Sequence, residues 1–142
     1  MPNYIVDASV VIEYLISGPF TSNVQVFFNT ISDDDTLTAP EFCLLECTNV
    51  IWKQVRFNNM PRSDAELLLQ VLRVLKIRRA PMKRLLDRTL EIALNNRIAV
   101  YDAGYIALSV HYGYPLVSID RQQIQAASNV GVTAVPIATF NA

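Results

Sequence analysis

The stretch YIVDAS (residues 4–9) indicates the fold class, because an apolar run ends in an acid just before a helix-like segment. The same order returns near the other end of the chain in LVSID (residues 116–120). Short apolar runs of this kind are typical of strands that are buried on both faces of a parallel sheet. The carboxyl ends of such strands converge on one crevice, where ligands bind. We therefore expect Asp7 and Asp120 to lie at the same edge of a parallel sheet.

The rest of the chain alternates between strand-like and helix-like segments. Strands are expected at residues 4–7, 36–39, 115–119 and 132–137, and helices at residues 9–17, 20–31, 41–58, 63–77, 83–97, 102–112 and 121–128. This alternation predicts an α/β fold in which helices cover both faces of a central parallel sheet, giving three α/β/α layers. The 142 residues, 51% of them hydrophobic, suit one compact core, so a single domain is expected over residues 1–142.

Three features of the sequence exclude whole classes of protein. No apolar run reaches the roughly 20 residues that cross a bilayer, and the N-terminus lacks the charged region and long apolar stretch of a signal peptide. A cytoplasmic domain without membrane contact is therefore expected, with Cys43 and Cys47 as buried reduced thiols. The only histidine is His111, which makes serine–histidine or cysteine–histidine catalysis a poor fit.

Four acids are the strongest candidates for chemistry. Asp7 and Asp120 follow expected strands, Asp102 opens an expected helix, and Glu46 lies inside another. Carboxylates gathered at one edge of a sheet raise one another's pKa values unless a cation holds them. Oxygen atoms are the ligands that hard divalent metals prefer. The four acids therefore predict a metal site suited to phosphoryl chemistry.

These acids also have purely structural interpretations. Asp102 and Asp120 could cap the helices that follow them, and Ser9 could cap the helix after the first strand. Asp7 is harder to explain in this way, because an unpaired carboxylate at the end of an apolar strand is costly to bury. A separate pattern, SDAE at residues 63–66, has the spacing of a capping box and predicts the start of a helix.

Basic residues are unevenly distributed, although the net charge is only −1. Residues 73–88 contain seven of the twelve basic residues and a single acid, so this segment is either a solvated helix face or a patch that contacts phosphates. Lys53 and Arg56 share a helix stripe with Glu46, which is either a solvent face or the wall of a groove that leads to the acids. The candidate phosphate contacts are Arg78, Arg79, Lys83, Lys53 and Arg56.

Four motifs occur in the order and at the separations found in PIN-domain nucleases. They are VDAS (residues 6–9), LECTN (residues 45–49) after Pro40, YDAGY (residues 101–105) and LVSID (residues 116–120). Through these motifs the chain resembles that family from residue 4 to about residue 136, and within the family it resembles the VapC-type toxins of bacterial and archaeal toxin–antitoxin pairs.

The resemblance implies a fold, an activity and partners. It implies an α/β/α domain with a parallel sheet, acting as a homodimeric ribonuclease that depends on magnesium or manganese and is inhibited by a cognate antitoxin. Position by position, the matches are Asp7, Glu46 and Asp102 for the three metal-holding acids, Asp120 for the fourth and more variable acid, and Ser9, Asn49 and Ser118 for polar residues of the site.

Other functions remain open at this point. The same chemistry could serve RNA processing without a toxin role, and a non-catalytic RNA-binding or dimerisation module would need none of the four acids. A haloacid-dehalogenase-like phosphatase also uses a strand-end Asp with magnesium, but it needs a second Asp two residues later, where this chain has Ser9.

The two helices expected at residues 41–58 and 63–77 carry apolar faces larger than a small sheet needs for its cover. Exposed apolar surface of this extent marks protein interfaces. We therefore expect these helices to take part in the homodimer.

Overall fold

Five strands form the central sheet in the order β3-β2-β1-β4-β5, and every neighbouring pair is parallel. The computed structural model describes residues 2–141. The predicted α/β class and parallel sheet are confirmed, with one strand more than the sequence indicated. The strands are β1 (Asn3–Val6), β2 (Thr36–Pro40), β3 (Arg78–Ala80), β4 (Leu116–Ser118) and β5 (Ala134–Pro136).

The apolar run at the start of the chain becomes the central strand of the sheet. Ile5 of β1 lies in register with Thr38 of β2 on one side and with Leu116 of β4 on the other. Ile5, Val6 and Leu116 are completely buried. A strand that is apolar on both faces needs cover on both faces, which the helices supply.

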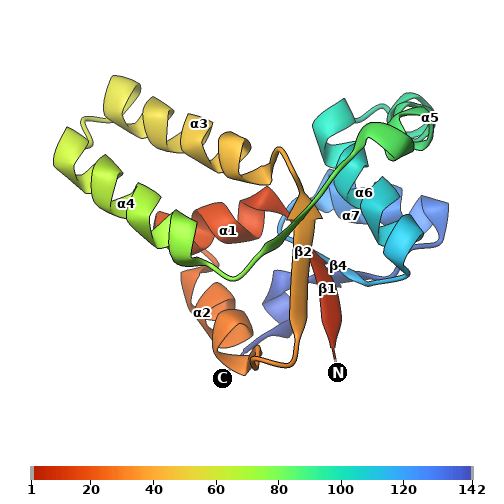
Figure 1. Cartoon of the computed structure of the whole chain (residues 1–142), viewed down its shortest axis with the longest axis horizontal. Helices are drawn as coiled ribbons and strands as arrows, with labels where there is room; N and C mark the ends of the chain where they lie inside the picture. The colour runs from red at the N-terminus through yellow and green to blue at the C-terminus, as the bar shows by residue number, and fades with distance from the viewer. Residues whose placement is uncertain (1, 142) are drawn as a thin grey trace.

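The helices form the two outer layers of the molecule. In Figure 1, α1 to α4 lie on one side of the sheet and α5 to α7 on the other, so the three-layer prediction is confirmed. No helix within residues 2–141 is long and apolar enough to cross a membrane. The helices are α1 (Ala8–Leu15), α2 (Thr21–Thr30), α3 (Cys43–Phe57), α4 (Arg62–Val74), α5 (Leu86–Asn96), α6 (Val100–Tyr112) and α7 (Arg121–Val130), with the short 3-10 helices η1 (Lys83–Leu85) and η2 (Ile137–Thr139).

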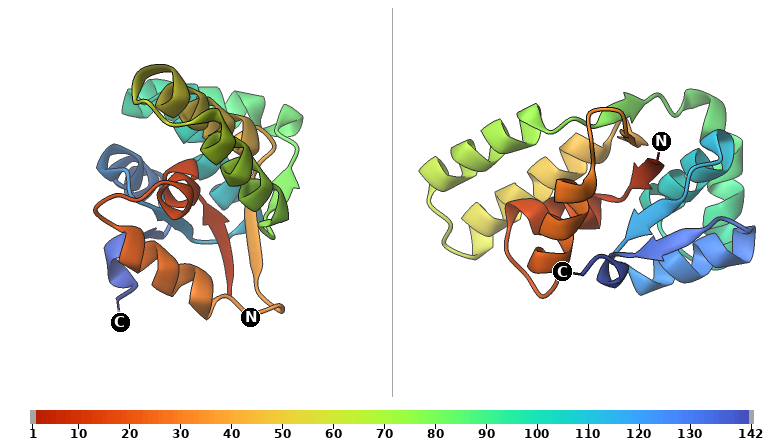
Figure 2. Two further views of the ribbon diagram at one scale, coloured as in Figure 1. Left: turned by 90° about the vertical axis from the view of Figure 1, so that its left-hand side faces the viewer. Right: turned by 90° about the horizontal axis from the view of Figure 1, so that it is seen from below.

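Helices α3 and α4 form a pair that extends away from the sheet. They lie side by side in both views of Figure 2, and only the first turn of α3 stays near the strands in Figure 1. Cys43 and Cys47 are buried free thiols at this end of α3, as predicted. Glu46, in the first turn of α3, therefore lies close to the sheet, whereas the far end of the helix pair lies in solvent.

The capping box predicted at residues 63–66 is wrong. Helix α4 begins one residue earlier, because the carbonyl of Pro61 accepts hydrogen bonds from the N–H groups of Asp64 and Ala65 at 3.0 and 3.2 Å. Pro61 is the capping residue and has extended backbone angles. Ser63 thus lies inside the first turn, where its hydroxyl cannot act as the cap.

Strand β3 was not predicted, because it lies in the basic segment and has no apolar alternation. Its register with β2 pairs Thr38 with Arg78 and Ala39 with Arg79. Both arginines are exposed, and only Ala80 is buried. Charged residues on an edge strand prevent pairing with other chains, so this composition suits the place of β3 in the sheet.

The fold places one edge of the sheet at a topological switch point. From β1 the sheet continues through β2 to β3 in one direction and through β4 to β5 in the other. The helices that follow the two central strands lie on opposite faces, α1 on one side and α7 on the other (Figure 1). A crevice at the carboxyl ends of β1 and β4 is the usual ligand site of such sheets.

Candidate metal centre

Asp7 lies directly after β1 and Asp120 two residues after the end of β4, and each caps the helix that follows. Asp7 Oδ2 accepts the N–H of Ser9 at 3.0 Å, and Asp120 Oδ1 accepts the N–H groups of Gln122 and Gln123 at 2.9 and 3.1 Å. The structural role considered for Asp120 is therefore correct. The capping role considered for Ser9 is wrong, since Asp7 is the cap of α1.

Ser9 connects the two loops instead. Its hydroxyl oxygen accepts the N–H of Ile119 at 3.3 Å, and the N–H of Asp7 donates to the carbonyl of Val117 at 3.0 Å. Both bonds join the end of β1 to the end of β4. They fix the separation of the two strand-end acids.

Asp102 reaches the same edge from α6, but it is not a helix cap. The helix begins at Val100, and the carbonyl of Ala99 accepts the first helical hydrogen bond, from the N–H of Ala103 at 3.0 Å. Asp102 is therefore the third helical residue. Its half-buried carboxylate lies near the N–H groups of the first turn, where the helix dipole favours negative charge.

Glu46 comes from the first turns of α3 and is held by a tyrosine. The hydroxyl of Tyr105 donates to Glu46 Oε1 at 2.8 Å. Tyr105 is completely buried on α6, and burial raises the pKa of its phenol, so the hydroxyl keeps its proton and acts as a donor. Tyr105 lies three residues after Asp102, so the same face of α6 serves two of the acids.

The pKa values of three acids reflect their proximity. Burial raises the pKa of Glu46 to about 7; the Tyr105 hydrogen bond opposes this rise, and the charges of Asp7 and Asp102 add to it. Burial and the charges of Asp7 and Asp120 raise the pKa of Asp102 to about 6. Burial also raises the pKa of Asp7, against the hydrogen bonds from Ser9 and Gln123, and the charge of Asp120 adds to the rise. The four acids therefore interact with one another, and the negative charge in this group is not compensated.

The donor set fits a hard divalent cation. It consists of carboxylate oxygens, and within residues 2–141 the single ion pair joins Lys76 to Asp33 at 3.1 Å, away from this group. In the same part of the chain no three acidic, histidine or cysteine side chains are arranged closely enough to enclose an ion as they stand. The acids thus form an open group, and a bound cation would have to draw the side chains inward.

Gln123 is the residue of this site that the sequence analysis missed. Its side chain is 1% exposed and donates to Asp7 Oδ1 at 3.0 Å, while its own Oε1 accepts the hydroxyl of Ser118 at 2.6 Å. The hydroxyl of Ser118 also accepts the N–H of Asp120 at 3.0 Å. One signal in the sequence could have revealed this residue. Gln123 is a polar residue on the apolar side of α7, the side that also carries Ala126 and Ala127, and it comes three residues after Asp120.

The other predicted site residues lie outside this hydrogen-bonded group. Asn49, Lys53 and Arg56 are exposed on α3, and the α-helical rise puts Lys53 roughly 10 Å beyond Glu46 along the axis. Arg78 and Arg79 are exposed on β3, and Lys83 is exposed in η1, just beyond the carboxyl end of that strand. None of these basic side chains belongs to the acidic group, and Arg78 instead stacks over the ring of Tyr112 at the end of α6, with 5.6 Å between its Cζ and the ring centroid.

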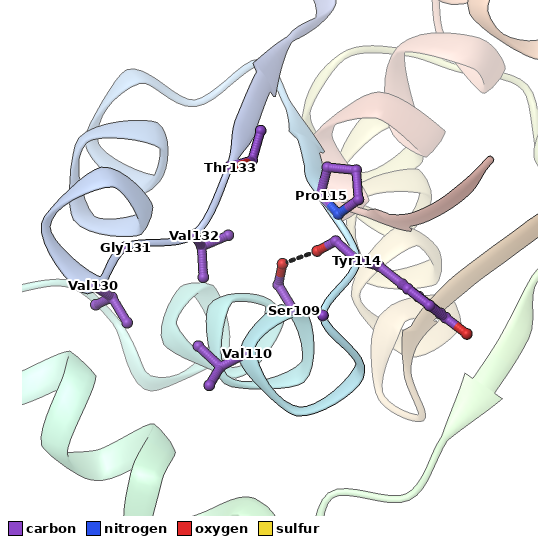
Figure 3. A pocket seen from close by; sticks show the side chains of 9 residues that line it. Ser109, Val110, Tyr114, Pro115, Val130, Gly131, Val132 and Thr133 are labelled. Carbon is purple, nitrogen blue, oxygen red and sulfur yellow. Dashed lines mark hydrogen bonds between the residues drawn. The ribbon is translucent and has the colours of Figure 1, made fainter.

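A cavity of about 370 Å³ lies at the opposite edge of the sheet, before the starts of β4 and β5 (Figure 3). In this cavity the hydroxyl of Ser109 points toward the main-chain carbonyl of Tyr114 and donates to it. None of the side chains drawn there is charged. This cavity is separate from the candidate metal centre, which lies at the carboxyl ends of the strands.

The sequence of this chain is similar to a known domain family and to a ribonuclease. The family model for the PIN domain matches residues 4–129. Ribonuclease VapC3 of Pyrobaculum aerophilum is 25% identical over 122 residues, which are 83% of this chain and 89% of that protein.

Two crystal structures share the fold. PAE2754 of Pyrobaculum aerophilum has a TM-score of 0.70 and 22% identity, with 97% of this chain and 92% of that chain covered. VapC20 of Mycobacterium tuberculosis, a toxin that cleaves the sarcin–ricin loop, has a TM-score of 0.69 and 13% identity, with 93% and 98% covered.

Proposed function

This chain belongs to the PIN domain family, and from that premise we propose that it is a divalent-metal-dependent endoribonuclease, the toxin of a toxin–antitoxin pair in the cytoplasm. One observation carries the proposal. Four carboxylates from separate parts of the chain meet at the switch point of the sheet, with raised pKa values for three of them. The similarity to a curated ribonuclease supports RNA as the substrate, and the VapC-type motifs support the toxin role.

Asp7, Glu46, Asp102 and Asp120 are the residues that would hold Mg²⁺ or Mn²⁺. When bound, such an ion neutralises charge on the scissile phosphate and supplies a water molecule of lowered pKa. Asp7 and Asp120 are held rigidly as helix caps, and Glu46 is oriented by Tyr105. The one histidine, His111, lies in the last turn of α6, far along the helix from Asp102. The residues of this site therefore favour hydrolysis by water.

RNA would reach the acids along the exposed basic side chains. Arg78, Arg79 and Lys83 lie on or just after β3, which runs parallel to β2 and ends at the same edge of the sheet as β1 and β4. The acidic centre alone would repel a polyanion. Exposed cations near the carboxyl ends of the strands would offset that repulsion and orient the phosphate backbone.

Replacing Arg78, Arg79 and Lys83 by glutamine is expected to weaken RNA binding and to reduce its salt dependence. A protein that contacts single-stranded nucleic acid loses about 0.7 in the slope of log K against log salt for each lost phosphate contact, so the slope should fall by about 2. Fluorescence anisotropy with labelled RNA at several salt concentrations measures both effects. Turnover at saturating RNA should fall much less.

A control with the same change in net charge replaces Arg62, Arg73 and Lys76, which are exposed on or after α4. It should leave the salt slope near the wild-type value. If both triple variants lower the slope equally, the effect is one of total charge, and Arg78, Arg79 and Lys83 make no specific phosphate contacts.

A homodimer is proposed from the exposed apolar side chains of α3 and α4. Although the two helices pack on each other, Trp52, Phe57 and Leu67 remain more than half exposed, at 54%, 64% and 60%. A second apolar surface, on α5 and the start of α6, was not predicted. Its exposed residues are Leu86, Leu90, Leu94, Val100 and Tyr101.

Light scattering of the free protein at micromolar concentration is expected to give the mass of a dimer. Replacing Leu67 and Val71 of α4 by glutamate should yield a folded monomer, because charge in an apolar interface opposes association. The matched pair, Leu90 and Leu94 of α5, tests the second surface. A wild-type monomer would contradict the dimer, and dissociation by the α5 pair alone would move the interface to that surface.

The proposed inhibitor is a partner protein that inserts an arginine among the four acids. A guanidinium group can form a bidentate pair with a carboxylate and would supply the positive charge that this group lacks. Co-expression of a candidate antitoxin should suppress cleavage in proportion to its binding. Growth unaffected by the unpartnered protein would count against the toxin role but not against the nuclease.

The basic test of the function is cleavage of RNA by the purified protein with and without Mg²⁺ or Mn²⁺. We expect internal cleavage of a single-stranded RNA only when the divalent ion is present. A protein that binds RNA and never cleaves it would instead be the non-catalytic module.

A further inference from the structure

Gln123 contacts three of the four acids at the candidate metal centre. One N–H of its side-chain amide donates to Asp7 Oδ1 at 3.0 Å, and the other donates to the main-chain carbonyl of Asp102 at 3.2 Å. Its own main-chain N–H donates to Asp120 Oδ1 at 3.1 Å. One residue of α7 therefore links the end of β1, the first turn of α6 and the start of its own helix.

The orientation of this amide is determined by its neighbours. The main-chain carbonyl of Asp102 can only accept, so Nε2 must face it, and the same nitrogen donates to Asp7 Oδ1. The amide oxygen then faces the hydroxyl of Ser118, which donates to it at 2.6 Å. Both amide hydrogens and the oxygen are thus engaged. Since Gln123 is buried, no water competes for these bonds.

A purely structural role would not require this chemistry. A leucine or methionine at position 123 could fill a similar volume beside Ala126 and Ala127, which form the rest of the buried side of α7. It could not hold Asp7 or the first turn of α6. Beyond packing, the glutamine fixes the position of the Asp7 carboxylate and of the main chain at Asp102.

We propose that Gln123 is a positioning residue of the metal centre, which presents Asp7, Asp102 and Asp120 together to a divalent cation. The inference rests on the proposed function. Ser118 supports this arrangement in two ways: its hydroxyl donates to the amide oxygen of Gln123, and it accepts the N–H of Asp120 at 3.0 Å. Groups that orient the ligands of a metal commonly contribute 10–100-fold to its affinity.

Mn²⁺ titrated into the full chain by calorimetry, without RNA, tests the proposal. Gln123→Leu should bind Mn²⁺ roughly 10–100-fold more weakly than the wild type. Ser118→Ala should show a smaller loss in the same direction. The loss in the double variant should be smaller than the sum of the two single losses, because part of the effect of the hydroxyl runs through the amide. With RNA, Gln123→Leu should lower kcat and leave KM close to the wild-type value.

Gln125→Leu is the matched control. Gln125 lies on the same helix and is exposed, and within residues 2–141 its side chain bonds only to that of Asn129, at 3.1 Å, so its replacement should leave Mn²⁺ affinity unchanged. Circular dichroism establishes that each variant is folded. Should Gln123→Leu fail to fold, Ser118→Ala carries the test.

Three outcomes would overturn the proposal. They are wild-type Mn²⁺ affinity in folded Gln123→Leu, wild-type affinity in Ser118→Ala where it carries the test, and losses of the two variants that simply add in the double variant. These results leave the proposed function in place. A wild-type protein without measurable Mn²⁺ affinity would instead remove the proposed function, and this inference with it.

Discussion

Replacement of Asp102 by Asn is expected to abolish RNA cleavage and, at the same time, to stabilise the metal-free protein. Cleavage should fall roughly a thousandfold or more, because a bound metal supplies several kcal/mol of transition-state stabilisation. Stability should rise near neutral pH, since burial and two neighbouring acids make the charge of Asp102 unfavourable in the folded state. The melting temperature in EDTA and the cleavage rate in Mg²⁺ should therefore change in opposite directions.

Asp7→Asn should lose cleavage to the same degree without a comparable gain in stability. Both carboxylate oxygens of Asp7 accept hydrogen bonds, from the N–H of Ser9 and from the amide of Gln123. Asparagine offers one oxygen, so one buried donor would lose its partner and offset the relief of charge. Asp34→Asn, at an exposed acid before β2, is the control and should change neither quantity. Undiminished cleavage by both Asp102→Asn and Asp7→Asn would contradict the site.

Mn²⁺ is expected to raise the melting temperature far more at about pH 8 than at about pH 5. The pKa of Glu46 rises from 4.5 to about 7 on folding, and that of Asp102 from 3.8 to about 6. For both groups the folded state holds the proton more tightly than the unfolded state. Their contribution to stability is therefore present below about pH 4 and is lost as the pH rises through 6 and 7.

A divalent cation supplies at high pH the positive charge that protons supply at low pH. The Mn²⁺-free protein should melt at a lower temperature as the pH rises through this window, and Mn²⁺ should restore the difference. Scanning calorimetry measures this pH dependence in the wild type and in the double variant Glu46→Gln, Asp102→Asn. The difference between the two proteins is the contribution of Glu46 and Asp102. An equal Mn²⁺ effect at both pH values in the wild type would show that the cation does not bind at these acids.

The positions of the strand-end acids could be read from the sequence because local pattern and fold agree there. An apolar run that ends in aspartate defines a buried strand, and parallel strands end at one edge of the sheet. Asp7 and Asp120 needed no further information. Each of these two acids caps a helix and also belongs to the charged group. The two interpretations of Asp120 are therefore compatible, and the capping role of Asp7 was not expected.

The remaining parts of the site depend on contacts between distant segments. The hydrogen bond from Tyr105 to Glu46 joins two helices, and the bond from Gln123 to Asp7 spans 116 positions of the chain. In the sequence alone, Tyr105 looks like an ordinary buried aromatic residue, and Gln123 is marked only as a polar residue on the apolar side of its helix. Strand β3 was missed for another reason, since its exposed arginines look like any charged surface.

The ends of the RNA products test the central claim most directly. Purified protein, end-labelled single-stranded RNA and Mg²⁺ should give internal cleavage with 5′-phosphate and 3′-hydroxyl ends, because water attacks the phosphate in place of the neighbouring 2′-hydroxyl. EDTA and Asp102→Asn should each abolish that cleavage. Cyclic 2′,3′-phosphate ends, or cleavage that persists unchanged in EDTA, would contradict hydrolysis at a carboxylate-held metal.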